Sequence, residues 1–339
     1  MHILANRSLK PYNTLWVDAI AKELMFLESA DDCITFSKLP GNNILLWWWS
    51  NVLLTSDYYD HVWVIQDNQT PELVEDNDHH TIIKVKAGYS RDSFVQWTLE
   101  HGYDGLENMG LIPGTVGAGT LGSIGAYGKE IGMFVDQVEY IDLTEGEIKL
   151  LSHHQCQFSY RRSIFKSMSN YCIRSVYFRF WKSTYKLSTH YPDIQKYLLD
   201  HAIRSEELTA KKLYQIICEI RTNKMPSRDE WWCAGSFRKN PTVEPIEKDR
   251  ILAFDPHLKY FPYEDKYKLA ASYLLEHLWY RWMTIVTPSW WSVGCYKDQT
   301  LILVNNGGTG KEIDTFAQTI EKAVFEYYGV VLEREAILL

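Results

Sequence analysis

Three short stretches contain residue types that bind phosphate or metal, and the first is the glycine pattern GAGTLG at residues 117–122. Glycines at this spacing let the backbone approach the pyrophosphate of a dinucleotide when the loop joins a strand to a helix. However, the preceding LIPGTV is no convincing strand, and the following SIGAYG does not open a helix. The context therefore argues against a Rossmann-type dinucleotide site in spite of the match.

The second stretch, NNGGTGKE at residues 305–312, resembles a phosphate-binding loop and follows the apolar run TLILV. Asn305 stands where the first glycine of such a loop belongs, and Glu312 stands where a serine or threonine would hold magnesium. The better interpretation is an ordinary loop between a strand and a helix.

The third stretch contains His153, His154 and Cys156, which are possible metal ligands. No second cluster completes a tetrahedral set, and a solvated turn explains these residues as well, so we expect no metal site. The six cysteines are scattered along the chain without C-x-x-C spacing. Neither a zinc site nor a disulfide framework is indicated, and reduced thiols are expected.

Composition limits the class of partner. The chain has 339 residues, of which 46% are hydrophobic and 23% charged, as expected of a globular protein with one large or several small cores. The formal net charge of -8, without a basic cluster, argues against a nucleic-acid or membrane partner. The sequence lacks a signal-peptide core and a long apolar run. We expect a cytoplasmic protein, a monomer, that acts on a small molecule.

Local patterns predict the first elements. Residues 81–102, TIIKVKAGYSRDSFVQWTLEHG, indicate a strand followed by a helix that Ser90 caps and Gly102 closes. The buried side of this helix is expected to contain Phe94, Val95, Trp97 and Leu99. Residues 103–128 are rich in glycine and too broken for either periodicity, so we expect a long loop organised by what it wraps.

Later segments complete a mixed pattern. Residues 135–151 predict a hairpin, and residues 205–221 predict a helix behind an acidic first turn, followed by a domain boundary. Residues 311–329 predict a second amphipathic helix that stops at Gly329, and residues 330–339 predict a final strand. Strands and helices are mixed without strict alternation, which favours an α+β fold over a doubly wound sheet.

Two long motifs carry a family resemblance. GLENMGLIPGTVGAGTLGSIGAYGKEI at residues 105–131, followed by CQFSYRRSIFK at residues 156–166, is similar to the UDP-N-acetylenolpyruvoylglucosamine reductase family. Shorter stretches agree in order and spacing over nearly the whole chain: SLKPYNT (8–14), SNVLL (50–54), RTNKMP (221–226), AGSFRKNP (234–241), KLAA (268–271), LILVNNG (301–307) and LEREA (332–336).

The resemblance implies a two-lobed domain that binds flavin adenine dinucleotide (FAD) and an inserted α+β domain that binds the substrate. In this chain, residues 1–78 and 326–339 correspond to the first lobe, residues 79–224 to the second lobe and residues 225–325 to the substrate domain. In the family, NADPH or NADH reduces the flavin, which passes a hydride to the enolpyruvyl double bond of a UDP-sugar. The product, UDP-N-acetylmuramate, is a peptidoglycan precursor.

The resemblance assigns catalytic roles to Arg161, Ser236 and Glu335. Arg161 and Glu335 would stabilise the developing enolic charge, and Ser236 would donate a proton to the strongly basic enolic carbon. Arg162 stands where the family has an acid beside the catalytic arginine. Without the resemblance, Arg161 and Arg162 are simply a solvated charge pair, and Glu335 is an edge charge on a strand.

Binding roles follow from the same resemblance. Tyr160, Tyr191, Lys224 and Asn240 correspond to substrate-binding positions, although Tyr160 is equally explained as a half-buried strand aromatic. The cofactor would be held by Ser50, Asn51, Gly114, Gly117, Gly122, Ser123, Gly125 and Tyr127.

The chain departs from the family pattern at its tryptophans. Where the family has a Gly-x-Gly-Ser-Asn loop, whose amides hold the FAD pyrophosphate, this chain has Trp47-Trp48-Trp49 before Ser50 and Asn51. Trp16, Trp231-Trp232 and the WYRW of residues 279–282 also stand where the family keeps glycine, and Trp290-Trp291 lie in an insertion.

The sequence therefore leaves several functions open. One is an active flavin-dependent reductase, in which one or two indoles stack on the cofactor. Another is a cofactor-free pseudoenzyme, a natural relative or an engineered variant. In such a protein, the cleft that holds FAD in the family would be filled by Trp16, Trp47, Trp48, Trp49, Trp231 and Trp232. A third is a site for another flat ligand between the tryptophans and a side widened by Gly122 and Ser123, where the family has Gln-Asn.

Overall fold

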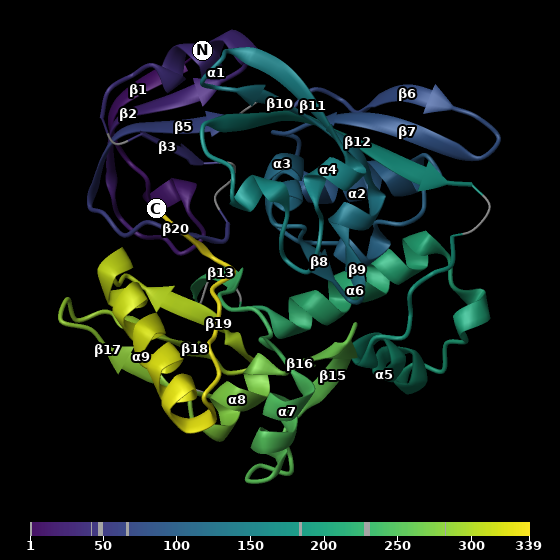
Figure 1. Cartoon of the computed structure of the whole chain (residues 1–339), viewed down its shortest axis with the longest axis vertical. Helices are drawn as coiled ribbons and strands as arrows, with labels where there is room; N and C mark the ends of the chain where they lie inside the picture. Colours follow the sequence, from purple (N-terminus) through teal and green to yellow (C-terminus); the bar gives the residue numbers. More distant parts are fainter. Residues whose placement is uncertain are drawn as a thin grey trace. The chain divides into compact units, whose positions relative to one another are not determined.

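The computed structural model describes residues 2–41, 43–46, 50–65, 68–182, 185–226, 231–281 and 283–339. The chain forms two compact units (Figure 1). Unit 1 comprises residues 1–6, 22–48 and 60–223, and unit 2 comprises residues 7–21, 49–59 and 224–339. Helices and antiparallel sheets occur in both units, so the predicted α+β class is confirmed. The finer division into two lobes and a substrate domain stays a prediction.

A five-stranded sheet is the centre of unit 1. Its strand order is β11-β10-β12-β7-β6, and each neighbouring pair is antiparallel. The strands are β6 (Glu72–Asp76), β7 (His80–Lys86), β10 (Val135–Asp142), β11 (Glu147–Ser152) and β12 (Tyr171–Trp181). A second sheet has the order β1-β2-β5-β3, with β1 (His2–Ser8), β2 (Ile20–Leu27), β3 (Asn43–Leu46) and β5 (Tyr58–Ile65).

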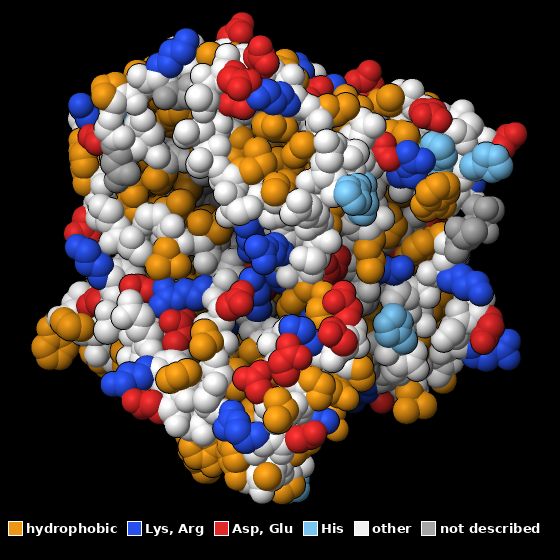
Figure 2. Space-filling view, in the orientation of Figure 1, with side chains coloured by type: hydrophobic (Ala, Val, Ile, Leu, Met, Phe, Trp, Pro, Cys, Tyr) orange, Lys and Arg blue, Asp and Glu red, His pale blue; other side chains and the backbone are white. Residues whose placement is uncertain are grey.

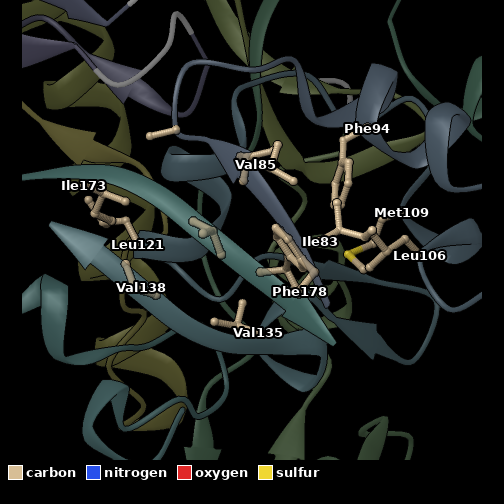
Figure 3. Packing of buried hydrophobic residues seen from close by; sticks show 14 of the residues in the cluster. Ile83, Val85, Phe94, Leu106, Met109, Leu121, Val135, Val138, Ile173 and Phe178 are labelled. Carbon is tan, nitrogen blue, oxygen red and sulfur yellow. The ribbon is translucent and has the colours of Figure 1, made fainter. Parts of the chain in front are cut away.

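One face of the five-stranded sheet packs against helices. The helices and short strands of unit 1 are α1 (Ala30–Ser37), α2 (Arg91–Glu100), α3 (Val116–Leu121), α4 (His153–Cys156), α5 (Pro192–Asp200), α6 (Ala210–Lys224), β8 (Gly125–Ala126) and β9 (Lys129–Glu130). Figure 3 shows Phe94 of α2 beside Ile83 of β7 and Phe178 of β12, and the Phe94 and Phe178 ring centroids are 4.8 Å apart. This buried cluster fixes the loops that leave the sheet.

The described part of unit 2 contains three sheets and three α-helices. The sheets have the orders β13-β19-β18-β17, β14-β16-β15 and β20-β4. The strands are β4 (Val52–Leu53), β13 (Trp232–Ser236), β14 (Thr242–Val243), β15 (Tyr260–Tyr263), β16 (Lys266–Leu269), β17 (Thr284–Val286), β18 (Ser292–Tyr296), β19 (Gln299–Asn306) and β20 (Ile337–Leu338). The helices are α7 (Pro245–Leu252), α8 (Ala271–His277) and α9 (Gly310–Tyr328).

Several locally encoded elements are confirmed. Ser90 caps α2 by accepting a hydrogen bond from the Ser93 amide, and β10 and β11 form the predicted hairpin. The NNGGTGKE stretch joins β19 to α9 through the short loop of residues 307–309, and Thr309 and Glu312 form a reciprocal capping box at the start of α9. Gly329 ends α9 with a φ of 71°, as expected of a left-handed helix stop.

Four expectations need correction. The loop of residues 103–128 contains the short helix α3, because Thr115 caps it by accepting from the Ala118 amide. Helix α6 begins at Ala210 rather than in the acidic segment, since Leu208 is extended and Thr209 Oγ1 accepts from the Lys212 amide. The final strand is only Ile337–Leu338, because its partner β4 has two residues. On α2, Trp97 and Leu99 are only half-buried, and Arg91 and Thr98 join Phe94 and Val95 on the buried side.

Further observations concern membrane-spanning helices, metal sites, thiols and surface charge. Within the described part of the chain, no helix is long and apolar enough to cross a membrane, and no cluster of histidine, cysteine and acidic residues could hold a metal ion. All six cysteines are free thiols. On the face drawn in Figure 2, acidic and basic side chains are interspersed.

Candidate active site

The predicted site residues belong to two sets, one on each compact unit. Arg161 is the centre of the set on unit 1. It lies in a tight turn closed by two backbone hydrogen bonds between Ser159 and Arg162, and its φ of 55° is in the left-handed region. The Arg161 side chain is 15% exposed. Its Nη2 donates to the Gly125 carbonyl at 2.5 Å, and its Nη1 lies 3.3 Å from Glu130 Oε1.

Glu130 is a site residue that the sequence reasoning missed. It lies on β9, which pairs with β8 so that Glu130 faces Gly125, the residue whose carbonyl also binds Arg161. The other carboxylate oxygen of Glu130 accepts a hydrogen bond from Ser123 Oγ at 3.3 Å. Exposed Arg162 stands where the family has an acid next to the catalytic arginine. In this chain the carboxylate that contacts Arg161 comes from Glu130 on β9. Its only signal in the sequence was its place inside the long GAYGKEI motif.

The glycine-rich loop runs between Gly114 and Tyr127 on unit 1. Gly117 packs against Ala87, where an added Cβ would come within 2.8 Å of the Ala87 Cβ, so a larger residue does not fit. Gly122 has open space, because an added Cβ would meet only Lys166 Cε, at 3.8 Å. Ser123 is buried and Tyr127 half-buried, and both have positive φ values, of 44° and 49°. The loop is thus tightly packed at Gly117 and open at Gly122.

Arg91 fixes the start of this loop. It is only 3% exposed, and its guanidinium donates to the carbonyls of Ile112 and Pro113, directly before Gly114. Burial, together with repulsion from Arg221, lowers the pKa of Arg91 to about 9. The group still carries its charge at neutral pH, so it binds the two carbonyls as a cation. This role of Arg91 was not predicted, because the periodicity of the helix indicated apolar residues on the buried side.

Two tyrosines and an arginine line the far end of the loop. The rings of Tyr127 and Tyr191 are 5.2 Å apart in an edge-to-face arrangement. Burial raises the pKa of Tyr127 to about 12, and burial also raises the pKa of Tyr191 while the nearby Arg161 charge opposes that shift. The nearby Arg221 charge opposes the rise in the pKa of Tyr127, and the buried Arg221 Nε has no hydrogen-bond partner among the residues described. Arg221 belongs to the RTNKMP motif, but its part in this cluster was not predicted.

Ser236 and Glu335 form the set on unit 2. The chain segment after β13 pairs with residues 333–336: the Lys239 amide donates to Glu333, the Glu335 amide donates to Phe237, and Arg238 bridges to Arg334. The structure therefore brings Ser236, directly before Phe237, next to Glu335. Ser236 is exposed and Glu335 half-buried. A hydroxyl donor and a carboxyl group thus lie on adjacent backbones.

Asn51 belongs to the same cluster. Its Nδ2 donates to the Glu335 carbonyl at 3.2 Å, and its own carbonyl accepts from the Ile337 amide at 2.9 Å. The φ of Asn51 is 60°, a conformation that asparagine tolerates better than most residues. Asn51, predicted to bind the cofactor, therefore also holds Glu335 in place. Ser50 is half-buried beside it.

The remaining predicted residues have different surroundings. Asn240 Oδ1 accepts from the Ala271 amide at 3.0 Å, so this side chain caps α8 in addition to any role toward a ligand. The guanidinium carbon of Arg161 lies over the Tyr160 ring, 5.1 Å from the ring centroid. Lys224 is half-buried in the last turn of α6.

Three of the described tryptophans share an unusual backbone conformation. Trp16, Trp279 and Trp290 have φ values of 58°, 65° and 65°, in the left-handed region that glycine adopts at little cost. Within unit 2, Trp16 stacks on Trp232, with ring centroids 4.0 Å apart and an interplanar angle of 8°. Trp47, Trp48 and Trp49 lie outside the described residues, so the predicted filling of the cofactor cleft stays a prediction.

The residues of unit 1 fit a flavin-type cofactor. The open backbone at Gly122 leaves space against the loop, and Arg221 Nε is a buried donor without an acceptor among the described residues. Buried donors of this kind suit an anionic or carbonyl group. On unit 1, a glycine-rich loop beside a fixed arginine is compatible with the class of flavin-dependent reductases.

Comparison with known proteins narrows this class. Residues 226–339 match the family model of the UDP-N-acetylenolpyruvoylglucosamine reductase C-terminal domain. The chain is 33% identical to the UDP-N-acetylenolpyruvoylglucosamine reductase of Flavobacterium johnsoniae and 35% identical to that of Bdellovibrio bacteriovorus, with 99% of each chain covered. The crystal structure of the Thermus caldophilus enzyme has the same fold, with a TM-score of 0.64 and 17% identity over 99% of this chain and 98% of that one. The chain belongs to the UDP-N-acetylenolpyruvoylglucosamine reductase family.

Proposed function

We propose that this protein reduces the enolpyruvyl group of UDP-N-acetylglucosamine enolpyruvate to give UDP-N-acetylmuramate, with FAD and NADPH as cofactors. Family membership over the whole length of the chain supports the proposal. The observation on this chain that carries it is the fixed position of Arg161, which Glu130 and the Gly125 carbonyl of the glycine-rich loop hold. When bound, reduced FAD supplies the hydride.

Arg161 would stabilise negative charge on the substrate. A guanidinium presents two or more parallel N–H donors to a carboxylate, which suits the carboxyl end of an enolpyruvyl group. Because Arg161 is already fixed by Glu130 and Gly125, little reorganisation is needed when charge develops. Tyr160, whose ring lies beside this guanidinium, would limit the directions in which it can point.

The hydroxyl oxygen of Ser236, Oγ, would carry the proton that completes the reduction. A serine hydroxyl is a weak acid, so it donates only to a strongly basic carbon that is positioned on it. Glu335 would help to stabilise the developing enolic charge, and Asn51 would keep the Glu335 backbone in place.

The remaining predicted residues would bind and orient the ligands. Lys224 would supply a point charge for the substrate diphosphate, with Tyr191 and Asn240 as polar contacts of the nucleotide sugar. The cofactor would contact the loop that contains Gly114, Gly117, Gly122, Ser123, Gly125 and Tyr127. Ser50 and Asn51 would bind another part of the cofactor. The three-part division at residues 78, 224 and 325, a monomeric state and a cytoplasmic location complete the proposal.

A visible absorption spectrum tests the cofactor assignment directly. The purified protein is incubated with excess FAD and desalted, and flavin bands are expected to remain with the protein. A colourless protein after this treatment would overturn the flavin-dependent proposal and favour the cofactor-free alternative, in which tryptophans fill the cleft.

Substitution of Ser236 tests the chemical assignment. In Ser236→Ala, we expect NADPH oxidation that depends on the UDP-sugar to fall by about 10² to 10⁴-fold, with retained flavin bands, because only the proton donor is lost. Ser205→Ala, an exposed serine in a surface turn, is the matched control and should keep wild-type turnover. Undiminished turnover in Ser236→Ala would remove this residue from the mechanism.

A further inference from the structure

Two buried thiols meet in the core of unit 1. Cys33 on α1 and Cys172 on β12 are 139 positions apart in the sequence, and their sulfur atoms are 3.4 Å apart. They are 4% and 2% exposed. Both belong to one apolar cluster, whose other buried members are Met25, Leu27, Trp63, Ile65 and Ile141. The cluster joins α1 and the β1-β2-β5-β3 sheet to strands β10 and β12.

The geometry of the pair is close to that of a disulfide. A disulfide bond is about 2.05 Å long, so the two sulfurs need to approach by little more than 1 Å. Cys33 is on a helix of eight residues and Cys172 on the middle strand of a five-stranded sheet. We expect the short helix to be the element that shifts, since β12 is paired with β10 at Cys172 and with β7 from Ser175 onward. A small movement of α1 is sufficient to bring the sulfurs into bonding distance.

We propose that Cys33 and Cys172 form a redox-active dithiol site that a hydroperoxide oxidises to a disulfide between α1 and β12. The Cys33 sulfur attacks one oxygen of hydrogen peroxide, so that an S–O bond forms as the O–O bond breaks and Cys33 becomes a sulfenic acid. The other peroxide oxygen takes up the thiol proton and leaves as water. The Cys172 sulfur then attacks the sulfenic sulfur; the S–O bond breaks, the S–S bond forms, and a second water leaves. The two thiols lose two electrons and the peroxide gains them.

The order of attack follows from the surroundings of the two cysteines. Asp31 and Thr35, on either side of Cys33 along α1, are exposed, so local opening of this short helix brings Cys33 to the solvent. The hydrogen bond with Cys33 and burial raise the pKa of the Cys172 thiol well above its ordinary value, which keeps it protonated and unreactive toward peroxide. Cys33 is therefore the attacking residue and Cys172 the resolving residue.

Peptide mapping by mass spectrometry tests the bond. The reduced protein is treated with hydrogen peroxide, alkylated under denaturing conditions and digested without reductant. We expect a linked pair of peptides that contain Cys33 and Cys172, and the loss of two of the six thiols. Cys156→Ala, a buried thiol on α4, is the matched control and should still form the link. The proposal is overturned if both thiols stay reduced, or if either pairs with another cysteine.

Trapping with dimedone, which reacts with sulfenic acids, tests the order of attack. In Cys172→Ala, the peroxide-treated protein should gain the adduct at Cys33, because no resolving thiol remains. In Cys33→Ala, Cys172 should stay unmodified. An adduct on Cys172 in the second variant would reverse the assigned roles, and absence of an adduct in both variants would contradict the sulfenic step. Circular dichroism on each variant shows whether it has folded.

Discussion

Glu130 controls how Arg161 is held. One of its oxygens contacts the guanidinium and the other accepts from Ser123, so the carboxylate joins the arginine to the glycine-rich loop. Both partners are largely shielded from water, with 15% and 23% of their side chains exposed. Shielded charge-assisted hydrogen bonds are stronger and better oriented than surface ion pairs. Glu130 is therefore a positioning residue.

Glu130→Gln should lower kcat by about tenfold with little change in KM, because the neutral amide holds the guanidinium less firmly. Steady-state kinetics with NADPH and the UDP-sugar measure this. Glu130→Asp should recover part of the loss, which a merely structural role would not predict. Glu147→Gln, an exposed glutamate on β11, is the control. An unchanged kcat in Glu130→Gln would contradict the positioning role.

At the scale of elements, three helices of unit 2 converge on one carboxylate. Asp255, beyond the end of α7, accepts hydrogen bonds from Tyr273 of α8 and Tyr328 of α9, at 2.7 and 3.0 Å. His277 of α8 lies 2.9 Å from the same carboxylate. Burial alone would raise the pKa of Asp255, but the hydrogen bonds from the two tyrosines and the histidine hold it below its ordinary value. The carboxylate thus stabilises the packing of α7, α8 and α9.

Asp255→Asn should destabilise the protein by about 2 kcal/mol at pH 7, because two tyrosines and a histidine lose a charged acceptor. Since the pKa is lower in the folded state, the stabilisation is fully present above the unfolded value of about 3.9 and is lost as the pH falls through the folded value. The difference between wild type and variant should therefore shrink below about pH 4. Urea unfolding at pH 7 and at pH 3.5 measures both quantities.

The control for this prediction is Asp298→Asn, an exposed aspartate in the turn between β18 and β19. Its stability should stay close to that of the wild type at both pH values. An Asp255→Asn variant as stable as this control at pH 7 would show that the network contributes nothing to the folded state.

Elements with local signals could be predicted from the sequence, and elements that depend on distant partners could not. The Ser90 cap, the β10–β11 hairpin and the Gly329 stop are encoded within a few residues of one another. The length of β20 depends on β4, which lies almost 300 positions earlier. The site residues show the same dependence on distant partners. The resemblance predicted Ser236 and Glu335 separately, and the structure shows that the pairing near Phe237 brings their backbones together. The role of Glu130 follows from the β8–β9 register, which no local signal predicts.

Across the whole molecule, tryptophans in left-handed conformations differ in their surroundings. Trp279 is 84% exposed and Trp290 is 88% exposed, whereas Trp16 is half-buried and stacked on Trp232. A left-handed conformation costs a non-glycine residue about 1 to 2 kcal/mol. An aromatic stack contributes about 0.5 to 1.5 kcal/mol beyond the apolar area that it buries. Among these three tryptophans and the described residues around them, only Trp16 has an aromatic stack that offsets the cost of its backbone.

Trp279→Gly should therefore raise the free energy of unfolding by about 0.5 kcal/mol, after the greater entropy of glycine in the unfolded chain is subtracted. Trp16→Gly should lower it, because the stack and the buried area are lost. Chemical unfolding of the two variants side by side measures the difference. If Trp279→Gly is the less stable of the two, the exposed indole has a stabilising contact that its exposure conceals.

The pairing of β4 with β20 has a consequence for synthesis of the protein. Residues 52–53 are translated well before their strand partner, Ile337–Leu338, which follows almost 300 positions later in the chain. At ordinary elongation rates of about 5 to 20 residues per second, the early strand waits on the order of half a minute for its partner. Throughout that interval the nascent chain displays an unpaired, apolar Val52–Leu53 edge, which is the kind of segment that chaperones bind.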